Sequence, residues 1–115
     1  MKKSLLVLAA GLVMAVGCHQ LAPSKPIAEL TPQQAAGQRV FVSHCSGCHY
    51  ANMEKGLNGP GLEGLFRKPY LPSGAAAKDA RVTAVILQGR GMMLALGNTL
   101  SEPEFDDLMA YLHTL

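Results

Sequence analysis

A cluster of sulfur and imidazole side chains lies near the middle of the chain, in residues 45–49, which read CSGCH. Cys45 and Cys48 are three residues apart, and His49 follows directly, so one helical turn can bring both thiols to the same face. This C-x-x-C-H spacing is that of c-type haem attachment. Each thiol can form a thioether with a vinyl-derived carbon on one porphyrin edge, and His49 can then offer a ring nitrogen to iron. The pattern predicts one covalently bound haem c.

Three other interpretations of this cluster compete with haem attachment. A thioredoxin-like C-x-x-C pair would need a preceding strand and a βαβ pattern. A structural zinc site needs four ligands, and no second pair of Cys or His has suitable spacing. A disulfide between Cys45 and Cys48 suits an exported protein. It would explain neither His49 nor the methionines downstream, so haem is the favoured interpretation.

A second candidate iron ligand lies in residues 89–97, which read GRGMMLALG and contain the adjacent Met92 and Met93. Methionine most often fills gaps in a core. Its thioether is also a soft, neutral ligand, and ligation of haem iron by Met and His raises the reduction potential. A ligand in the sixth coordination position would keep oxygen and substrates from iron. The pair therefore favours electron transfer over catalysis, with no small-molecule substrate.

Helices are the elements expected to position these residues. Residues 31–34 (TPQQ) resemble a capped helix start, and this helix should run to about His44. Residues 101–104 (SEPE) form a similar start for a last helix, whose apolar residues follow the i, i+3, i+4, i+7 pattern. A middle helix is expected from Asp79, acting as its cap, to Leu87.

The segment between the first and middle helices is rich in Gly and Pro and leaves room for one short helix over residues 62–67. No segment alternates with a period of two. The predicted fold is therefore all-α, with three or four helices and long loops. Such loops are unusual in a compact domain unless they wrap around a bound group.

On these residues the chain resembles the class I c-type cytochromes, small bacterial electron carriers with one haem. The resemblance covers residues 31–115. Besides CSGCH, the matching segments are Gly37 with Phe41, residues 58–62 (NGPGL), residues 86–93, residues 100–104 and residues 108–112.

The resemblance implies a role for each matching residue. Cys45 and Cys48 would be the thioether anchors and His49 the proximal ligand, with the Pro60 carbonyl accepting the other ring N–H of His49. The first and last helices would cross at Gly37. Further residues would form the haem wall: Leu62, Leu65, Phe66, Ile86, Leu96 and Met109.

The spacing of the family motif also distinguishes the two methionines. In that motif the ligand falls four residues after the first glycine, which from Gly89 selects Met93 over Met92. The family usually has proline directly after the ligand, whereas this chain has Leu94. The loop should therefore be less preorganised, and Met93 should exchange more easily.

The N-terminus has the form of a secretory signal peptide, residues 1–17, with two lysines before an apolar run too short to span a bilayer. Residues 15–18 (AVGC) resemble a lipobox, so we expect acylation of Cys18 and anchoring at the periplasmic face of a bacterial membrane. Residues 18–30 would form a flexible tether to the haem domain, residues 31–115. Ordinary cleavage after Gly17 is the alternative, and it would give a soluble periplasmic protein.

These features predict an electron-transfer protein that is not an enzyme and whose partners are redox proteins and, through the lipid anchor, the membrane. Two alternatives remain open. One is a haem enzyme or gas-binding sensor in which the Met93 loop opens, and the other is a dedicated electron-transfer subunit of a dehydrogenase or oxidase. The formal net charge is +2, two of the positive charges belong to Lys2 and Lys3, and no basic run contains aromatics, so nucleic acid is not an expected partner.

Overall fold

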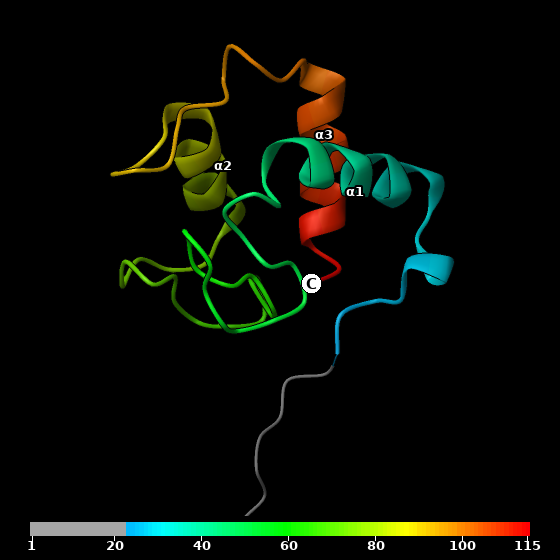
Figure 1. The fold of residues 1–115 in the computed structure, drawn as a ribbon, viewed down its shortest axis with the longest axis horizontal. Coiled ribbons are helices and arrows are strands. Elements are labelled where there is room, and N and C mark those ends of the chain that lie inside the picture. The colour runs from blue at the N-terminus through cyan, green and yellow to red at the C-terminus, as the bar shows by residue number, and fades with distance from the viewer. Residues whose placement is uncertain (1–22) are drawn as a thin grey trace, which may run out of the picture.

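Three α-helices form the framework of the protein, as a computed structural model describes it over residues 23–115. They are α1 (Pro32–His44), α2 (Asp79–Gln88) and α3 (Glu102–Leu112), preceded by a short 3-10 helix, η1 (Ile27–Glu29). Figure 1 shows α1 crossing α3, with α2 to one side and the loops between α1 and α2, drawn in green, below it. The fold is all-α, as predicted.

Capping boxes begin α1 and α3, as the sequence predicted. The Thr31 hydroxyl accepts from the Gln34 N–H at 3.2 Å, and the Gln34 amide oxygen accepts from the Thr31 N–H at 3.0 Å. Ser101 and Glu104 make the same exchange at 3.4 and 2.9 Å. Hydrogen bonds from the Ser101 backbone and hydroxyl lower the pKa of Glu104. The hydrogen bonds to the Glu104 carboxylate therefore stabilise the protein at neutral pH, and this stabilisation is lost as the pH falls through the lowered pKa of Glu104.

The start of α2 differs from the expectation. Asp79 is its first residue rather than its cap, and the preceding Lys78 makes no side-chain capping hydrogen bond. Asp79 still lies in the first turn, where a carboxylate is favoured by the helix dipole. The helix ends at Gln88, where Gly89 follows with φ 75°.

The predicted short helix over residues 62–67 is absent, and turns take its place. Gly64 has φ 69°, which lies in the left-handed region and interrupts a right-handed helix. The N–H groups of Arg67 and Lys68 both donate to the Gly64 carbonyl, at 2.9 and 3.0 Å. These hydrogen bonds close a single turn over residues 64–68 that does not continue as a helix.

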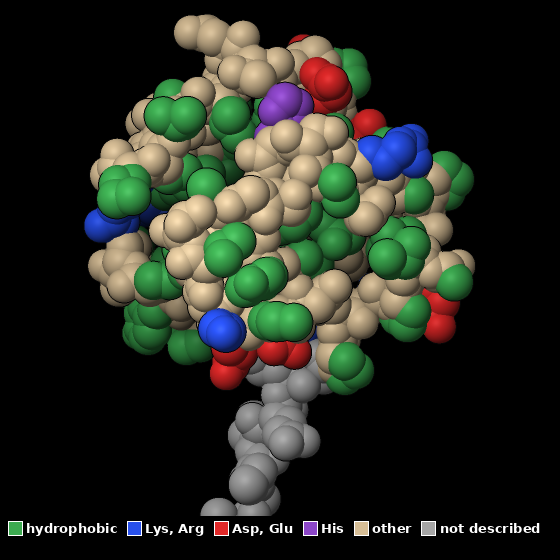
Figure 2. Space-filling model, viewed as in Figure 1, with side chains coloured by type: hydrophobic (Ala, Val, Ile, Leu, Met, Phe, Trp, Pro, Cys, Tyr) green, Lys and Arg blue, Asp and Glu red, His purple; other side chains and the backbone are tan. Residues whose placement is uncertain are grey.

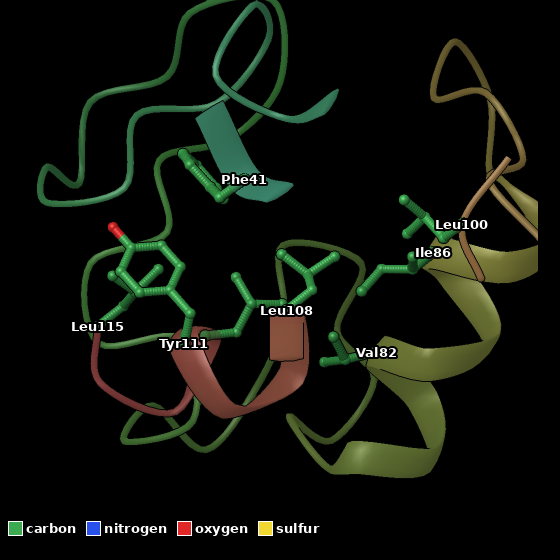
Figure 3. Close-up of a cluster of buried hydrophobic side chains, with 8 residues drawn as sticks. Phe41, Val82, Ile86, Leu100, Leu108, Tyr111 and Leu115 are labelled. Carbon is green, nitrogen blue, oxygen red and sulfur yellow. The ribbon is translucent and has the colours of Figure 1, made fainter. Parts of the chain in front are cut away.

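The crossing of α1 and α3 is a backbone-to-backbone contact at Gly37. A Cβ atom there would collide with the carbonyl oxygen of Asp107 and lie 2.8 Å from the Tyr111 Cβ. One turn further along α1, Phe41 packs on Tyr111 with ring centroids 5.6 Å apart. Leu108, which is fully buried, lies in Figure 3 between this pair and the α2 side of the core.

Val82 and Ile86 of α2 and Leu100 before α3 form that second side of the core, each less than a tenth exposed. Figure 3 shows these three side chains grouped together, across Leu108 from the Phe41–Tyr111 pair. The core thus joins α2, and with it the loop that follows, to the α1–α3 pair.

Part of the predicted tether contacts the domain. The Lys25 N–H donates to the Thr114 carbonyl at 2.9 Å, and its ammonium donates to the Gln34 side chain at 3.2 Å. A free tether could therefore extend only before Lys25. The predicted signal peptide and Cys18 lie outside the described residues. Among residues 23–115, no helix has the length and apolar character needed to cross a bilayer.

Replacing Gly37 with alanine should lower the free energy of unfolding, because the added methyl group cannot fit against the Asp107 carbonyl. Alanine alone would favour the helix by about 1 kcal/mol, but overpacking of this kind costs roughly 1–3 kcal/mol. Denaturant unfolding of the purified haem protein measures the difference. Gln33→Ala, an exposed substitution on the same helix, should change stability little, and a Gly37→Ala variant as stable as the wild type would contradict this account.

Candidate haem site

The CSGCH segment continues directly from the end of α1. The N–H groups of Cys48 and His49 both donate to the Cys45 carbonyl, at 3.0 and 2.9 Å, so the segment forms a tight turn. Cys45 is half-buried and packs against the core, whereas Cys48 is exposed. Neither forms a disulfide, so both sulfur atoms are available for covalent attachment.

Burial and, to a lesser degree, the neighbouring Cys48 raise the pKa of the Cys45 thiol to about 11. The thiol is therefore protonated and neutral at physiological pH, which suits its apolar surroundings. A thioether at this position would carry no titratable proton.

His49 is half-buried and is held through one of its ring nitrogens. Its Nδ1 atom lies 2.8 Å from the carbonyl oxygen of Pro60. A carbonyl oxygen only accepts, so Nδ1 is the donor, and in the neutral imidazole Nε2 then keeps its lone pair. The structure thus contains the contact that the resemblance implied for Pro60, and the remaining nitrogen of His49 is in the form that binds metals.

Residues 57–60 form a loop that is fastened to the CSGCH turn. The Gly59 N–H donates to the Cys48 carbonyl at 2.7 Å, and the Asn58 amide donates to the Gly47 carbonyl at 3.3 Å. Neither Asn58 nor Gly59 was among the predicted site residues, although both lie in the NGPGL segment. Their positions beside the turn come from long-range folding, which a local pattern does not encode.

The two methionines after α2 occupy different environments. Arg90 and Met93 exchange backbone hydrogen bonds of 3.0 and 2.9 Å, which makes a tight turn with Met92 near its tip. Met92 is 91% exposed, whereas Met93 is half-buried and packs against the core. Figure 1 shows this turn, in yellow-orange, projecting beyond α2.

Hydrogen bonds to α2 hold the far end of this loop. The Leu96 N–H donates to the Ile86 carbonyl at 2.9 Å, and the Gly97 N–H donates to the Leu87 carbonyl at 3.1 Å. Leu94, which occupies the family's proline position, is 78% exposed. Backbone pairing on both sides of Leu94 therefore restrains the loop without proline.

The residues predicted to form the haem wall gather around the core. Ile86 is buried within it, and the others pack against it partly buried: Leu62, Leu65, Phe66, Leu96 and Met109. The Phe66 ring stacks on His113 with centroids 3.9 Å apart, and the His113 Nε2 lies 3.0 Å from the Asp79 carboxylate. His113, directly after α3, is therefore engaged by Phe66 and Asp79.

These donors fit a c-type haem. Two unpaired thiols, one imidazole with a free Nε2 and one half-buried thioether match its anchors and its two axial ligands. Within residues 23–115 no group of three or more His, Cys, Asp or Glu side chains could hold another metal ion. This part of the chain therefore contains no cluster of side chains that could form the alternative structural zinc site.

Comparison with known proteins identifies the family of this chain. A family model described as cytochrome c oxidase, cbb3-type, subunit III matches residues 32–112. A cytochrome c6-like protein of Nostoc sp. is 32% identical over 90 residues, which cover 74% of this chain and 78% of that protein. A cytochrome c6 of Picosynechococcus sp. is 28% identical over 81 residues, covering 68% and 69%. The chain therefore belongs to the family described as cytochrome c oxidase, cbb3-type, subunit III. It is a monohaem c-type cytochrome, an electron carrier rather than an enzyme.

Proposed function

We propose that the protein carries single electrons on a haem anchored by Cys45 and Cys48, with His49 and Met93 as axial ligands. The observation that carries this assignment is the 2.8 Å contact of His49 Nδ1 with the Pro60 carbonyl, because it leaves Nε2 as the ligating atom. When bound, the haem supplies an iron that accepts and releases one electron.

His49 contributes through its tautomer and its fixed position. The Pro60 carbonyl holds the Nδ1 proton, which raises the basicity of Nε2 and restrains the ring. A ligand that does not move when the charge of the iron changes keeps the reorganisation energy of electron transfer small. This is what a carrier requires in both of its redox states.

Met93 contributes a neutral sulfur and closes the site. Its half-buried position, against the 91% exposure of Met92, supports Met93 as the second ligand. The paired backbone of the turn and the hydrogen bonds to α2 support a ligand that stays in place although Leu94 replaces proline. Because Met93 would fill the sixth coordination position of the iron, the site favours electron transfer over the alternative of a gas sensor.

The partners follow from the family and from the surface. The c6-type relatives support a mobile carrier between redox proteins, whereas the matching family model is described as an oxidase subunit and supports a second candidate, an electron-transfer subunit. Copurification of an oxidase from detergent-solubilised membranes would favour that second candidate. On the face in Figure 2, Lys and Arg side chains are scattered among apolar ones, which suits protein partners better than nucleic acid.

Export and anchoring complete the proposal and rest on the sequence of residues 1–18. The signal-like segment and the AVGC site support a periplasmic lipoprotein acylated on Cys18. Lys25, where contact with the domain begins, is the seventh residue after Cys18. At roughly 3.5 Å per extended residue, the anchor would keep the domain within about 25 Å of the membrane surface.

Met93→Ala should remove the weak long-wavelength absorption band that ferric haem shows when methionine sulfur is bound. It should also lower the reduction potential and permit rapid binding of carbon monoxide to the reduced protein, because the sixth position opens. Met92→Ala is the matched control and should keep the band, the potential and the closed site. The assignment is wrong if the band survives in Met93→Ala and disappears in Met92→Ala.

Cys18→Ser should move the protein from the membrane to the soluble periplasmic fraction, because the acyl chains would be lost. Intact mass spectrometry of the wild-type membrane fraction should find acyl groups on a chain that begins at Cys18. A wild-type protein that begins at Cys18 without acyl mass would instead establish the soluble periplasmic alternative.

A further inference from the structure

We propose that Gly59 is a positioning residue for His49, and that the absence of a side chain at this position sets the orientation of the imidazole ring and thereby the reduction potential. The inference rests on the proposed ligation by His49. It concerns a residue that would not bind the iron and that acts only through the ring.

Gly59 lies directly against the ring of His49. A Cβ atom built on Gly59 would lie 2.5 Å from Cε1 of His49, 2.9 Å from Nδ1 and 3.1 Å from Nε2. Real Cβ atoms essentially never approach other atoms within 3.0 Å, so something would have to move. The three affected atoms form the edge that carries both nitrogens, namely Nδ1, which contacts Pro60, and Nε2, which would bind the iron.

The loop that contains Gly59 cannot easily retreat from the ring, because its neighbours are held by hydrogen bonds. The Gly59 N–H is bound to the Cys48 carbonyl at 2.7 Å, directly before His49 in the chain. On one side of Gly59, the Asn58 side-chain amide donates to the Gly47 carbonyl at 3.3 Å. On the other side, the Pro60 carbonyl contacts His49 itself. With its neighbours fastened, a substituted residue 59 displaces the imidazole instead of the backbone.

Displacement of the ring would alter two properties that determine the state of the iron. Rotation of the imidazole plane changes the splitting of the iron orbitals, which the ferric electron paramagnetic resonance spectrum reports. A longer Nδ1–Pro60 contact makes Nε2 less basic, and a weaker donor stabilises the ferric state less. The reduction potential should then rise.

The experiment compares purified haem proteins carrying Gly59→Ala or the matched control Gly47→Ala. Gly47 lies in the turn that the loop contacts, but a Cβ there has no heavy atom within 4 Å, and its carbonyl is retained. We expect shifted ferric resonance signals and a higher potential in Gly59→Ala, and wild-type values in Gly47→Ala. Unchanged signals and potential in Gly59→Ala would overturn the proposal.

Asn58→Ala keeps the test decisive if Gly59→Ala yields no haem protein. It removes the 3.3 Å contact with Gly47 without adding an atom near the ring, so a smaller shift of the same two quantities is expected. Wild-type values in Asn58→Ala would then contradict the proposal. Loss of the wild-type ferric resonance signals in His49→Ala tests the proposed ligation by His49 separately, because it does not depend on a comparison of residue 59 variants.

Discussion

The close crossing of α1 and α3 is the contact on which the remaining structure depends. It requires a glycine at position 37, because the Asp107 carbonyl occupies the place of a side chain. The crossing fixes the direction in which α1 ends, and the CSGCH turn begins at that end. It also places Leu108 where α2 can pack, so one backbone contact orients both the proximal turn and the helix that leads to Met93.

Beyond these helices, hydrogen bonds between loops, rather than regular secondary structure, build the site. The 57–60 loop is fastened to the turn that contains the cysteines, and the 90–97 loop is fastened to the last residues of α2. Both loops present a candidate ligand, or its hydrogen-bond partner, from backbone that is fixed on two sides. A small chain with few aromatic residues can hold a large cofactor in this way without a large core of its own.

Much of the fold could be predicted because its signals are local. The two capping boxes, the prolines in the first turns and the apolar period of the last helix specify α1 and α3 within a few residues of sequence. The expected helix over residues 62–67 failed for a different reason. The Gly- and Pro-rich segment had room for a short helix, but Gly64 adopts a left-handed conformation that interrupts one, and composition does not reveal which glycine does so.

The sequence by itself determined the chemistry of the donors and the helical framework, since thiols, imidazole and caps act through residues at most four apart. It also gave two adjacent methionines, which the residues alone do not distinguish and which the family spacing ranked. Only the tertiary structure decided that Met92 lies in solvent and Met93 against the core, that Gly59 lies against the ring of His49, and that Lys25 joins the domain. Each of these depends on segments distant in the chain, and their approach is set by packing across α1, α2 and α3 rather than by any local pattern.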